Sequence, residues 1–225
     1  AGDRFGAAVR IEGDSLVVGT PQGLPFDDVV GAGAAYVFDR DELDPNLWLE
    51  VAKLTASDGD FGNFFGIAVD ISADRVVAGA PGDDDVASDA GSAYVYFRDE
   101  GGPGAWGQVK KLTSFDAGQN DSFGTAVAMD GERVVTSPVF ADEGGSDAGA
   151  AHIFVRDFNR DGEDLWRQEA KLRASDAAAD DLLGRGAAWS GNFVLLGAEG
   201  AEAAYLYDLS FFFEPTPTCV LFDRF

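Results

Sequence analysis

The sequence is poor in the residues that build most metal and nucleophile sites. Its 225 residues include one cysteine, Cys219, and one histidine, His152. A lone cysteine excludes an internal disulfide and a cysteine-rich zinc site, although an intermolecular disulfide stays open as the alternative to a buried thiol. A lone histidine gives little support for a zinc hydrolase or a Ser-His-Asp triad, and the glycine-rich stretches lack a Walker lysine. These absences predict a protein that is not an enzyme.

Positive charge and long apolar runs are also scarce. The chain has 16 Lys and Arg residues against 40 Asp and Glu residues, which gives a formal net charge of -24. Such a chain repels phosphates, so we expect no nucleic-acid partner. No run of eighteen apolar residues occurs, and we expect no membrane insertion. The first residues do not form a secretory signal, so we expect that a signal has been removed or that the chain is a fragment.

A repeat of roughly 60 residues dominates what is present. A Phe-Gly element recurs at residues 5–6, 65–66, 123–124 and, as Leu-Gly, 183–184. A Val-Val-Gly-like element recurs at 17–20, 77–80, 135–138 and 195–198, and an Ala-Tyr-Val-Phe-like element at 35–38, 93–96, 151–154 and 204–207. A fourth element runs from Trp to Lys-Leu at 48–54, 106–112 and 166–172. Each element has strand composition, and no segment shows helical periodicity.

Four short antiparallel strands per repeat predict an all-β chain, a β-propeller built from four-stranded blades. One blade cannot bury both of its faces alone, so neighbouring blades must stack. We divide the chain into blades at 1–58, 59–116, 117–176 and an incomplete 177–209, followed by a tail at 210–225. The tail carries no Trp and no Lys-Leu element, so the fourth strand of the last blade is missing from the pattern.

The repeated elements resemble FG-GAP repeats, the blades of the integrin α-subunit N-terminal propeller and of many bacterial surface proteins. The resemblance covers residues 3 to about 208, and the segment Lys53 to Asp58 resembles the bacterial secreted subgroup. It implies a secreted or cell-surface propeller that binds a protein or a glycan, often with calcium. Propellers of this family usually have seven blades, whereas this chain supplies slightly fewer than four.

Three explanations for the blade count stay open. The chain is a piece of a longer propeller, or a small ring in which Thr218 to Phe222 supplies the missing strand, or a subunit that shares strands with other copies. In the third case an unpaired strand edge invites strand addition. The assembly edge would then consist of Phe211, Phe212, Phe213, Val220 and Phe222.

These explanations give two main functional hypotheses. The first is a non-catalytic module for adhesion or for binding a protein or glycan. The second is a structural subunit that assembles with copies of itself. A secreted polysaccharide-acting enzyme is the least favoured alternative. Such an enzyme would use a close pair of carboxylates, but 40 acids guarantee some close pairs in any fold, so a pair is no evidence for this activity.

Calcium is the candidate cofactor. The family's usual acidic loop lies between the first two strands, but here those connections are the tight turns 12–14, 72–74, 130–132 and 190–192. A different hairpin places oxygen-bearing side chains at alternate positions before Gly162, as in loops that wrap calcium. An Asx-rich turn has the same composition and is the alternative reading. The candidate ligands are Asp157, Asn159, Asp161 and Asp164.

A second set of acids recurs between the second and third strands of the blades, so it lies on one rim of the propeller. It could bind cations or a basic partner, and the alternative is an acidic rim that only holds water. The residues of this acidic rim are Asp27, Asp28, Asp83, Asp84, Asp85, Asp89, Asp142 and Asp147.

The aromatic residues divide into recurring and isolated ones. Trp48, Trp106 and Trp166 recur with the fourth strand, which predicts packing between blades. His152 replaces a recurring tyrosine, which predicts a strand residue in the core. Trp189 falls outside this register and is the tryptophan we would test for ligand stacking.

Overall fold

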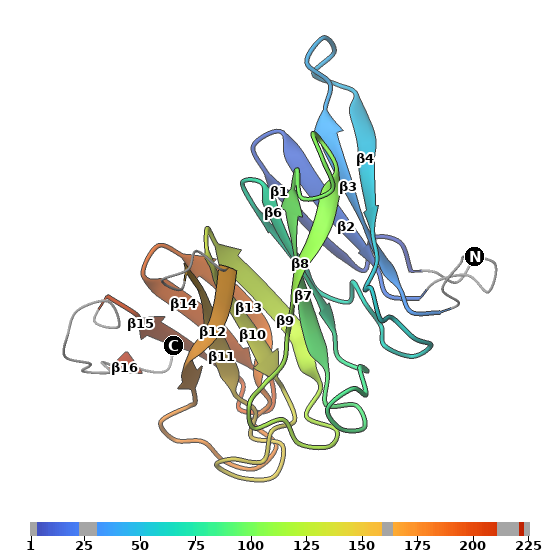
Figure 1. Ribbon diagram of the computed structural model, residues 1–225. Helices are drawn as coiled ribbons and strands as arrows, with labels where there is room; N and C mark the ends of the chain where they lie inside the picture. The colour runs from blue at the N-terminus through green and yellow to red at the C-terminus, as the bar shows by residue number, and fades with distance from the viewer. Residues whose placement is uncertain (1–3, 23–30, 159–163, 211–220, 223–225) are drawn as a thin grey trace.

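The computed structural model describes residues 4–22, 31–158, 164–210 and 221–222 (Figure 1). These residues form sixteen strands in four antiparallel sheets, and each sheet has its four strands in sequence order. Within them there is no helix that could cross a membrane. The expected all-β chain of four four-stranded blades is confirmed.

The strand bounds follow the repeated elements of the sequence. The first blade has β1 (Ala8–Glu12), β2 (Ser15–Thr20), β3 (Ala34–Arg40) and β4 (Trp48–Leu54). The second has β5 (Val69–Ser72), β6 (Arg75–Ala80), β7 (Ser92–Arg98) and β8 (Trp106–Leu112). The third has β9 (Phe123–Asp130), β10 (Arg133–Pro138), β11 (Ala151–Phe158) and β12 (Asp164–Leu172). The fourth has β13 (Leu183–Ser190), β14 (Phe193–Ala198), β15 (Ala203–Asp208) and β16 (Leu221–Phe222).

The first two strands of each blade are joined by a two-residue hairpin turn. Its first residue has a positive φ, which glycine adopts without strain: Gly13 at 57°, Gly131 at 61° and Gly191 at 57°. The second blade has Ala73 at this position with a φ of 51°. These connections are therefore the tight turns that the sequence predicts.

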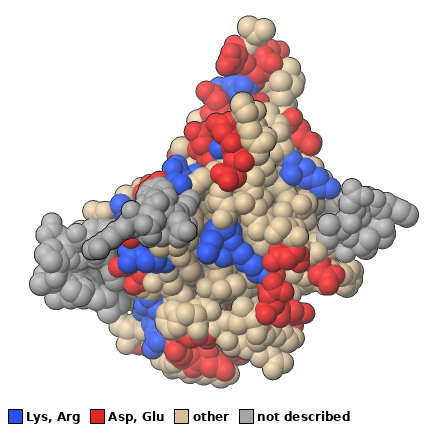
Figure 2. Space-filling model, viewed as in Figure 1, with Lys and Arg blue, Asp and Glu red and all other residues tan. Residues whose placement is uncertain are grey.

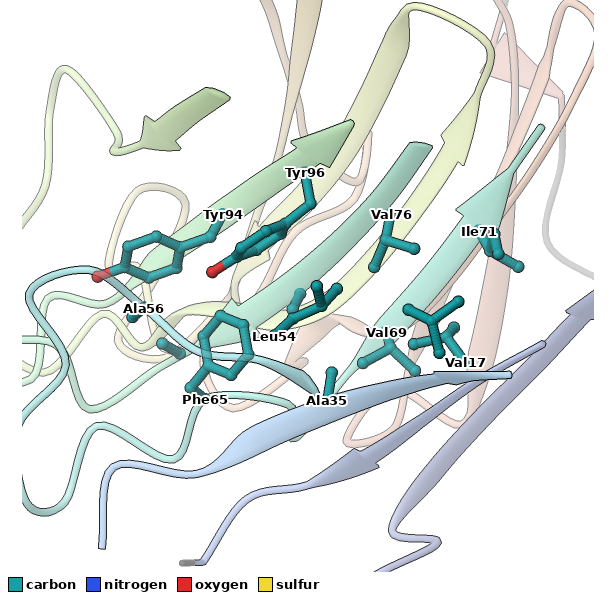
Figure 3. Packing of buried hydrophobic residues seen from close by; sticks show 13 residues of the cluster. Val17, Ala35, Leu54, Ala56, Phe65, Val69, Ile71, Val76, Tyr94 and Tyr96 are labelled. Atoms are coloured by element: carbon teal, nitrogen blue, oxygen red, sulfur yellow. The ribbon is translucent and has the colours of Figure 1, made fainter. Parts of the chain in front are cut away.

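The blades stack face to face along an arc, as Figure 1 shows. The first strands of all four blades lie innermost, because a single hollow is lined by residues 7–10, 67–69, 125–127 and 185–187. Apolar side chains fill each interface between neighbouring blades. Figure 3 shows the first interface, where Phe65 packs edge-on against Tyr94 and Tyr96 with ring centroids 5.6 and 6.0 Å apart.

The Phe-Gly element forms backbone contacts with the preceding blade. Phe65 is fully buried, and its N–H donates to the carbonyl oxygen of Ala32 at 2.8 Å. It forms a parallel bridge with Gly33, where a β-carbon would lie 2.1 Å from the Phe65 carbonyl oxygen. The same bridge recurs at the next two interfaces, as Gly91 with Phe123 and Gly149 with Leu183. Glycine at this position is therefore a steric requirement of blade stacking.

The tail supplies the fourth strand of the last blade. In β16, Phe222 pairs with Leu206 and Leu221 pairs with Tyr207 of β15. At these positions the strand edge is covered by the chain's own tail rather than by another copy, which is the outcome expected if Thr218 to Phe222 completes the blade. The other residues of the expected assembly edge, Phe211, Phe212, Phe213 and Val220, lie outside the described residues.

Candidate functional site

A cluster of carboxylates surrounds the ammonium group of Lys111. The Nζ atom lies 2.9 Å from Asp58 Oδ2, 2.9 Å from Asp83 Oδ2 and 2.6 Å from Asp85 Oδ2. One oxygen from each acid lies within 4.8 Å of the others, a spacing that could hold a metal ion. The ammonium group already supplies the positive charge at the centre of this cluster. The cluster is therefore a structural ion-pair network that joins the linker from blade 1 to the rim loop of blade 2.

Asp83 lies inside the rim loop rather than on its surface. Its side chain is only 2% exposed. It accepts hydrogen bonds from Ser92 Oγ at 3.0 Å and Asn63 Nδ2 at 3.2 Å, and Tyr94 Oη lies 2.8 Å from its Oδ2 atom. A buried carboxylate is stable only when it is paired and hydrogen-bonded in this way. Asp83 therefore anchors the loop and does not contribute to an exposed acidic surface.

The electrostatics of the cluster favour its charged form. Burial opposes the charge on Lys111, but the hydrogen bonds to the three carboxylates outweigh burial and raise the pKa of the ammonium group. Burial likewise opposes the charge on Asp58, but hydrogen bonds from Lys111 and Tyr94 lower the pKa of that carboxyl. Both partners therefore stay ionised around neutral pH.

A related cluster holds the next blade interface. Lys171 Nζ lies 2.6 Å from Asp116 Oδ2 and 2.9 Å from Glu143 Oε2. His152 occupies the position of Tyr94, is fully buried and has its Nδ1 atom 3.2 Å from Ser114 Oγ. Burial, reinforced by the Lys171 charge, lowers the pKa of His152 to about 4. The imidazole is therefore neutral at pH 7, and its expected place in the strand core is confirmed.

Sequence reasoning missed these linker acids, although the sequence contains a signal for them. Each follows Lys-Leu at a fixed distance, in the segments 53–58, 111–116 and 171–176. The acid at the end of each segment contacts the next blade, and at the last interface Tyr205 Oη donates to Asp176 Oδ1 at 2.7 Å. The recurrence of this spacing could have identified all three acids.

The exposed acids of the rim lie in two loops of the same construction. Asp84 Oδ1 accepts from the Asp89 N–H at 2.6 Å, and Asp142 Oδ1 accepts from the Asp147 N–H at 3.1 Å. Asp84, Asp89 and Asp142 are exposed, and Asp147 is half-buried. Asp85 is exposed apart from its contact with Lys111. Figure 2 shows that acidic side chains gather in separate patches on the viewed face, with basic side chains between them.

The rim loop is not present in every blade. The second and third blades connect their middle strands through residues 81–91 and 139–150, whereas the fourth blade uses only residues 199–202. Asp27 and Asp28, in the corresponding connection of the first blade, lie outside the described residues. Among the described residues, the long rim loop therefore occurs in the second and third blades, while the short connection of the fourth blade still carries two exposed acids, Glu199 and Glu202.

The expected calcium hairpin is described only in part. Asp157 lies in β11, where its Oδ2 atom is 3.1 Å from Arg167 Nη2. Asp164 begins β12 and its backbone pairs with Phe158. Asn159 and Asp161 lie outside the described residues. Calcium at this hairpin stays a prediction.

Two of the three recurring tryptophans lie at blade interfaces, whereas the ring of Trp48 lies 5.0 Å from the guanidinium of Arg40 in its own blade. Trp166 is almost fully buried, with its ring 6.4 Å from the ring of Phe97 in the preceding blade, which confirms packing between blades. Trp106 packs against the core of the first interface. Trp189 is half-buried and its Nε1–H donates to the Gly191 carbonyl oxygen at 2.9 Å. A ligand-stacking role for Trp189 stays a prediction.

Comparisons with solved structures agree with this fold. The proposed 6-phosphogluconolactonase of Bacteroides uniformis ATCC 8492 is 12% identical, with a TM-score of 0.55, over 97% of this chain and 56% of the other. Sqt1 from Chaetomium thermophilum is 15% identical, with a TM-score of 0.56, over 93% of this chain and 45% of the other. This chain thus spans about half the length of each, and at these identities the likeness concerns the fold alone.

A comparison with curated proteins finds no match. The family model for the FG-GAP repeat matches residues 1–38, 48–96, 106–154 and 166–207. Each of the last three units begins with the fourth strand of one blade and continues through three strands of the next, so the repeat spans the blade interfaces described above. The chain belongs to the FG-GAP repeat family.

Proposed function

We propose that this chain is a non-catalytic, extracellular binding module whose acidic rim contacts a protein partner with a basic surface. The observation that carries the proposal is the shared construction of the two described rim loops. Each loop is closed by a side-chain bond, Asp84 to the Asp89 N–H or Asp142 to the Asp147 N–H, and each presents acids to solvent.

The rim loops are held by hydrogen bonds within their own blades. Within the second blade, the Gly91 N–H donates to the Asp83 carbonyl oxygen at 2.9 Å, and the buried Asp83 side chain fixes the loop to its own blade. In the third blade the Gly149 N–H donates to the Ala141 carbonyl oxygen at 3.0 Å. A pre-ordered loop loses little conformational entropy on binding, and exposed acids attract a basic surface at long range.

The absence of catalysis is also part of the proposal. Groups with strongly shifted pKa values mark active sites when they lie in an open cleft. Here the pKa values of His152, Tyr94 and Lys111 are shifted, and all three side chains lie at blade interfaces where they bridge neighbouring elements. Their contacts are structural, which supports a binding role over an enzymatic one. An extracellular location is in keeping with the family.

The proposal is tested with a lysine-rich peptide as probe and with neutralised rim acids. Asp89 and Asp147 have φ values of 49° and 53°, a conformation that asparagine tolerates, so Asp89→Asn with Asp147→Asn removes two charges without new backbone strain. We expect this double variant to bind the peptide several-fold more weakly than the wild type, by isothermal titration calorimetry at about 0.15 M salt.

The matched control is Glu42→Gln with Glu100→Gln. These two exposed acids lie in the hairpins that follow β3 and β7, at the end of the strands opposite the rim. Their replacement removes the same total charge as the rim substitutions do. Equal weakening by both double variants would show a general charge effect and would contradict a rim site. Binding to a neutral glycan array that is unaffected by the rim substitutions would contradict it as well.

A further inference from the structure

The first and last blades each leave one apolar face without a neighbour. Val9 and Ile11 of β1 are 55% and 62% exposed, whereas their counterparts in the second blade, Val69 and Ile71, are 2% and 5% exposed. Val69 and Ile71 are buried because the first blade covers them. Val9 and Ile11 therefore form a front face that no described blade of this chain covers.

The opposite face is open on the fourth blade. Leu195 of β14 is 42% exposed, and its counterparts in the first three blades are fully buried beneath the next blade. These counterparts are Val17, Val77 and Val135. The two exposed faces are thus the two halves of the same interface that occurs three times inside the chain.

Residues that meet across the first two interfaces are chemically matched at one position. Asp39, the second-last residue of β3, accepts two bonds from Arg98 of β7, at 2.8 and 3.1 Å. The corresponding residue of the second blade is Phe97, and the Arg156 guanidinium lies over its ring at 4.4 Å. An acid meets a base at one interface and an aromatic ring meets a guanidinium at the next, so the two members of each pair suit each other.

The chain ends provide one more matched pair. Asp208 of β15 occupies the position of Asp39, and Arg40 of β3 occupies the position of Arg98. Arg40 is already arranged like Arg98. Its guanidinium lies 5.0 Å from the ring of Trp48 and 3.3 Å from Asp14, while that of Arg98 lies over Trp106 and pairs with Asp74 of its own blade.

We infer that the front face of blade 1 docks on the back face of blade 4 of a second copy of this chain, with Arg40 of one copy paired to Asp208 of the other. Two such contacts related by a two-fold axis place eight blades around one axis and leave no blade face exposed.

Two further positions agree with docking. A β-carbon at Gly19 or Gly79 would lie 2.0 or 1.9 Å from a carbonyl oxygen of the next blade, and the fourth blade keeps glycine there as Gly197. At the second interface the Gly131 N–H donates to Ser72 Oγ at 3.1 Å. Ser190 and Gly13 occupy these two positions at the open faces, so the copies can form the same bond.

One position opposes the contact and weakens it. Glu202, with a φ of 49°, stands where the other blades have Gly33, Gly91 and Gly149. A β-carbon there meets the carbonyl oxygen of the incoming Phe-Gly element, as the 2.1 Å separation at Gly33 shows. The net charge of -24 on each copy adds repulsion. The contact between copies is therefore weaker than the interfaces within a chain.

The decisive experiment reverses one charge in each of two separate variants, Arg40→Asp and Asp208→Arg. Alone, either variant places like charges at both contacts, and we expect its dimer to dissociate at least tenfold more readily than the wild type. In an equimolar mixture, each contact of a dimer formed from one copy of each variant joins opposite charges. Light scattering on a sizing column, at about 0.15 M salt, should therefore show a dimer for the mixture and monomers for the separate variants.

Controls keep the result interpretable. Arg167→Asp reverses an exposed arginine of the outer strand β12 and should leave the dimer unchanged, and circular dichroism establishes that every variant is folded. Glu202→Gly removes the opposing side chain and should tighten the dimer several-fold. A wild type that stays monomeric at every concentration, or a mixture that behaves like its separate components, would overturn the inference.

Discussion

Lys111 Nζ lies 2.9 Å from the Oδ2 atom of Asp83, a carboxylate that is buried in a loop expected from its sequence to be a solvated rim. The same ammonium group reaches Asp58 in the linker that follows the first blade. One side chain of β8 therefore fixes its own rim loop and the neighbouring blade at once. Because burial of an unpaired carboxylate is costly, the order of the loop depends on the lysine.

Replacing Lys111 with methionine should destabilise the protein and make its stability depend on calcium. The substitution leaves three carboxylates with oxygens within 4.8 Å of one another. Removing one partner of a buried pair costs about 3–5 kcal/mol, and because two of the acids are partly exposed we expect a loss of roughly 2 kcal/mol. Calcium should restore part of it, since carboxylate oxygens are its preferred ligands. Urea unfolding with and without calcium measures both effects.

The neighbouring Lys110 provides the control for this experiment. Lys110 is exposed and lies next to Lys111 on the same strand. Lys110→Met therefore changes the net charge equally without opening the cluster, and its unfolding free energy should stay within about 0.5 kcal/mol of the wild type. Equal losses for the two variants would refute the structural role of Lys111.

The neutral His152 should make the protein sensitive to moderate acid. Its pKa is about 4 in the folded protein against about 6.5 in the unfolded chain, so the unfolded state binds more protons below pH 6.5. The stability that depends on the neutral His152 is fully present above pH 6.5. It falls as the pH drops towards 4, and the loss is about 2.5 kcal/mol at pH 4.5. The carboxyls whose pKa values are lowered, such as Asp58 and Asp116, lose their stabilising effect only below about pH 4.

The variant His152→Tyr isolates this effect, because tyrosine occupies the same position in the other three blades. A tyrosine there can donate to Asp116 as Tyr205 donates to Asp176. We compare the loss of unfolding free energy between pH 7 and pH 4.5 in the two proteins. This loss should be smaller in the variant than in the wild type by at least about 2 kcal/mol. An unchanged pH dependence would show that another group is responsible.

Ala73→Gly should stabilise the second blade. Ala73 has a φ of 51° in a turn where the other three blades have glycine. The left-handed conformation costs a non-glycine residue about 1–2 kcal/mol, and the greater freedom of glycine in the unfolded chain offsets part of the gain. We expect a net gain of about 0.5–1 kcal/mol by urea unfolding. Ala87→Gly, in the rim loop without a positive φ, should instead give a loss.

Calcium binding at the hairpin between β11 and β12 is tested by isothermal titration calorimetry. We expect the wild type to bind calcium with modest affinity and Asp161→Ala to lose binding, because an acidic ligand is removed from the predicted loop. Asp44→Ala, in the acidic hairpin between β3 and β4, is the matched control and should bind as the wild type does. No heat in the wild type would reject the site.

Strand positions and blade stacking could be predicted because they depend on the repeat itself. Phe65 and Phe123 recur at the blade spacing, and both are buried at interfaces between the stacked blades that the repeat predicts. The Lys111 cluster could not be predicted in the same way, because its acids come from a linker and a loop that meet only in the folded chain. Likewise Val9 and Val69 have the same local sequence pattern, and their exposures differ because only Val69 has a blade in front of it.

The matched pairs at the blade interfaces restrict the order in which blades can follow one another. Repeat arrays commonly change length when a unit is gained or lost, because each unit contacts only its neighbours. Here, exchanging the second and third blades would place the Arg98 guanidinium against Val155, an apolar residue, and separate Arg156 from the ring of Phe97. These blades are therefore not interchangeable, and a change in their number needs compensating substitutions on two neighbouring faces.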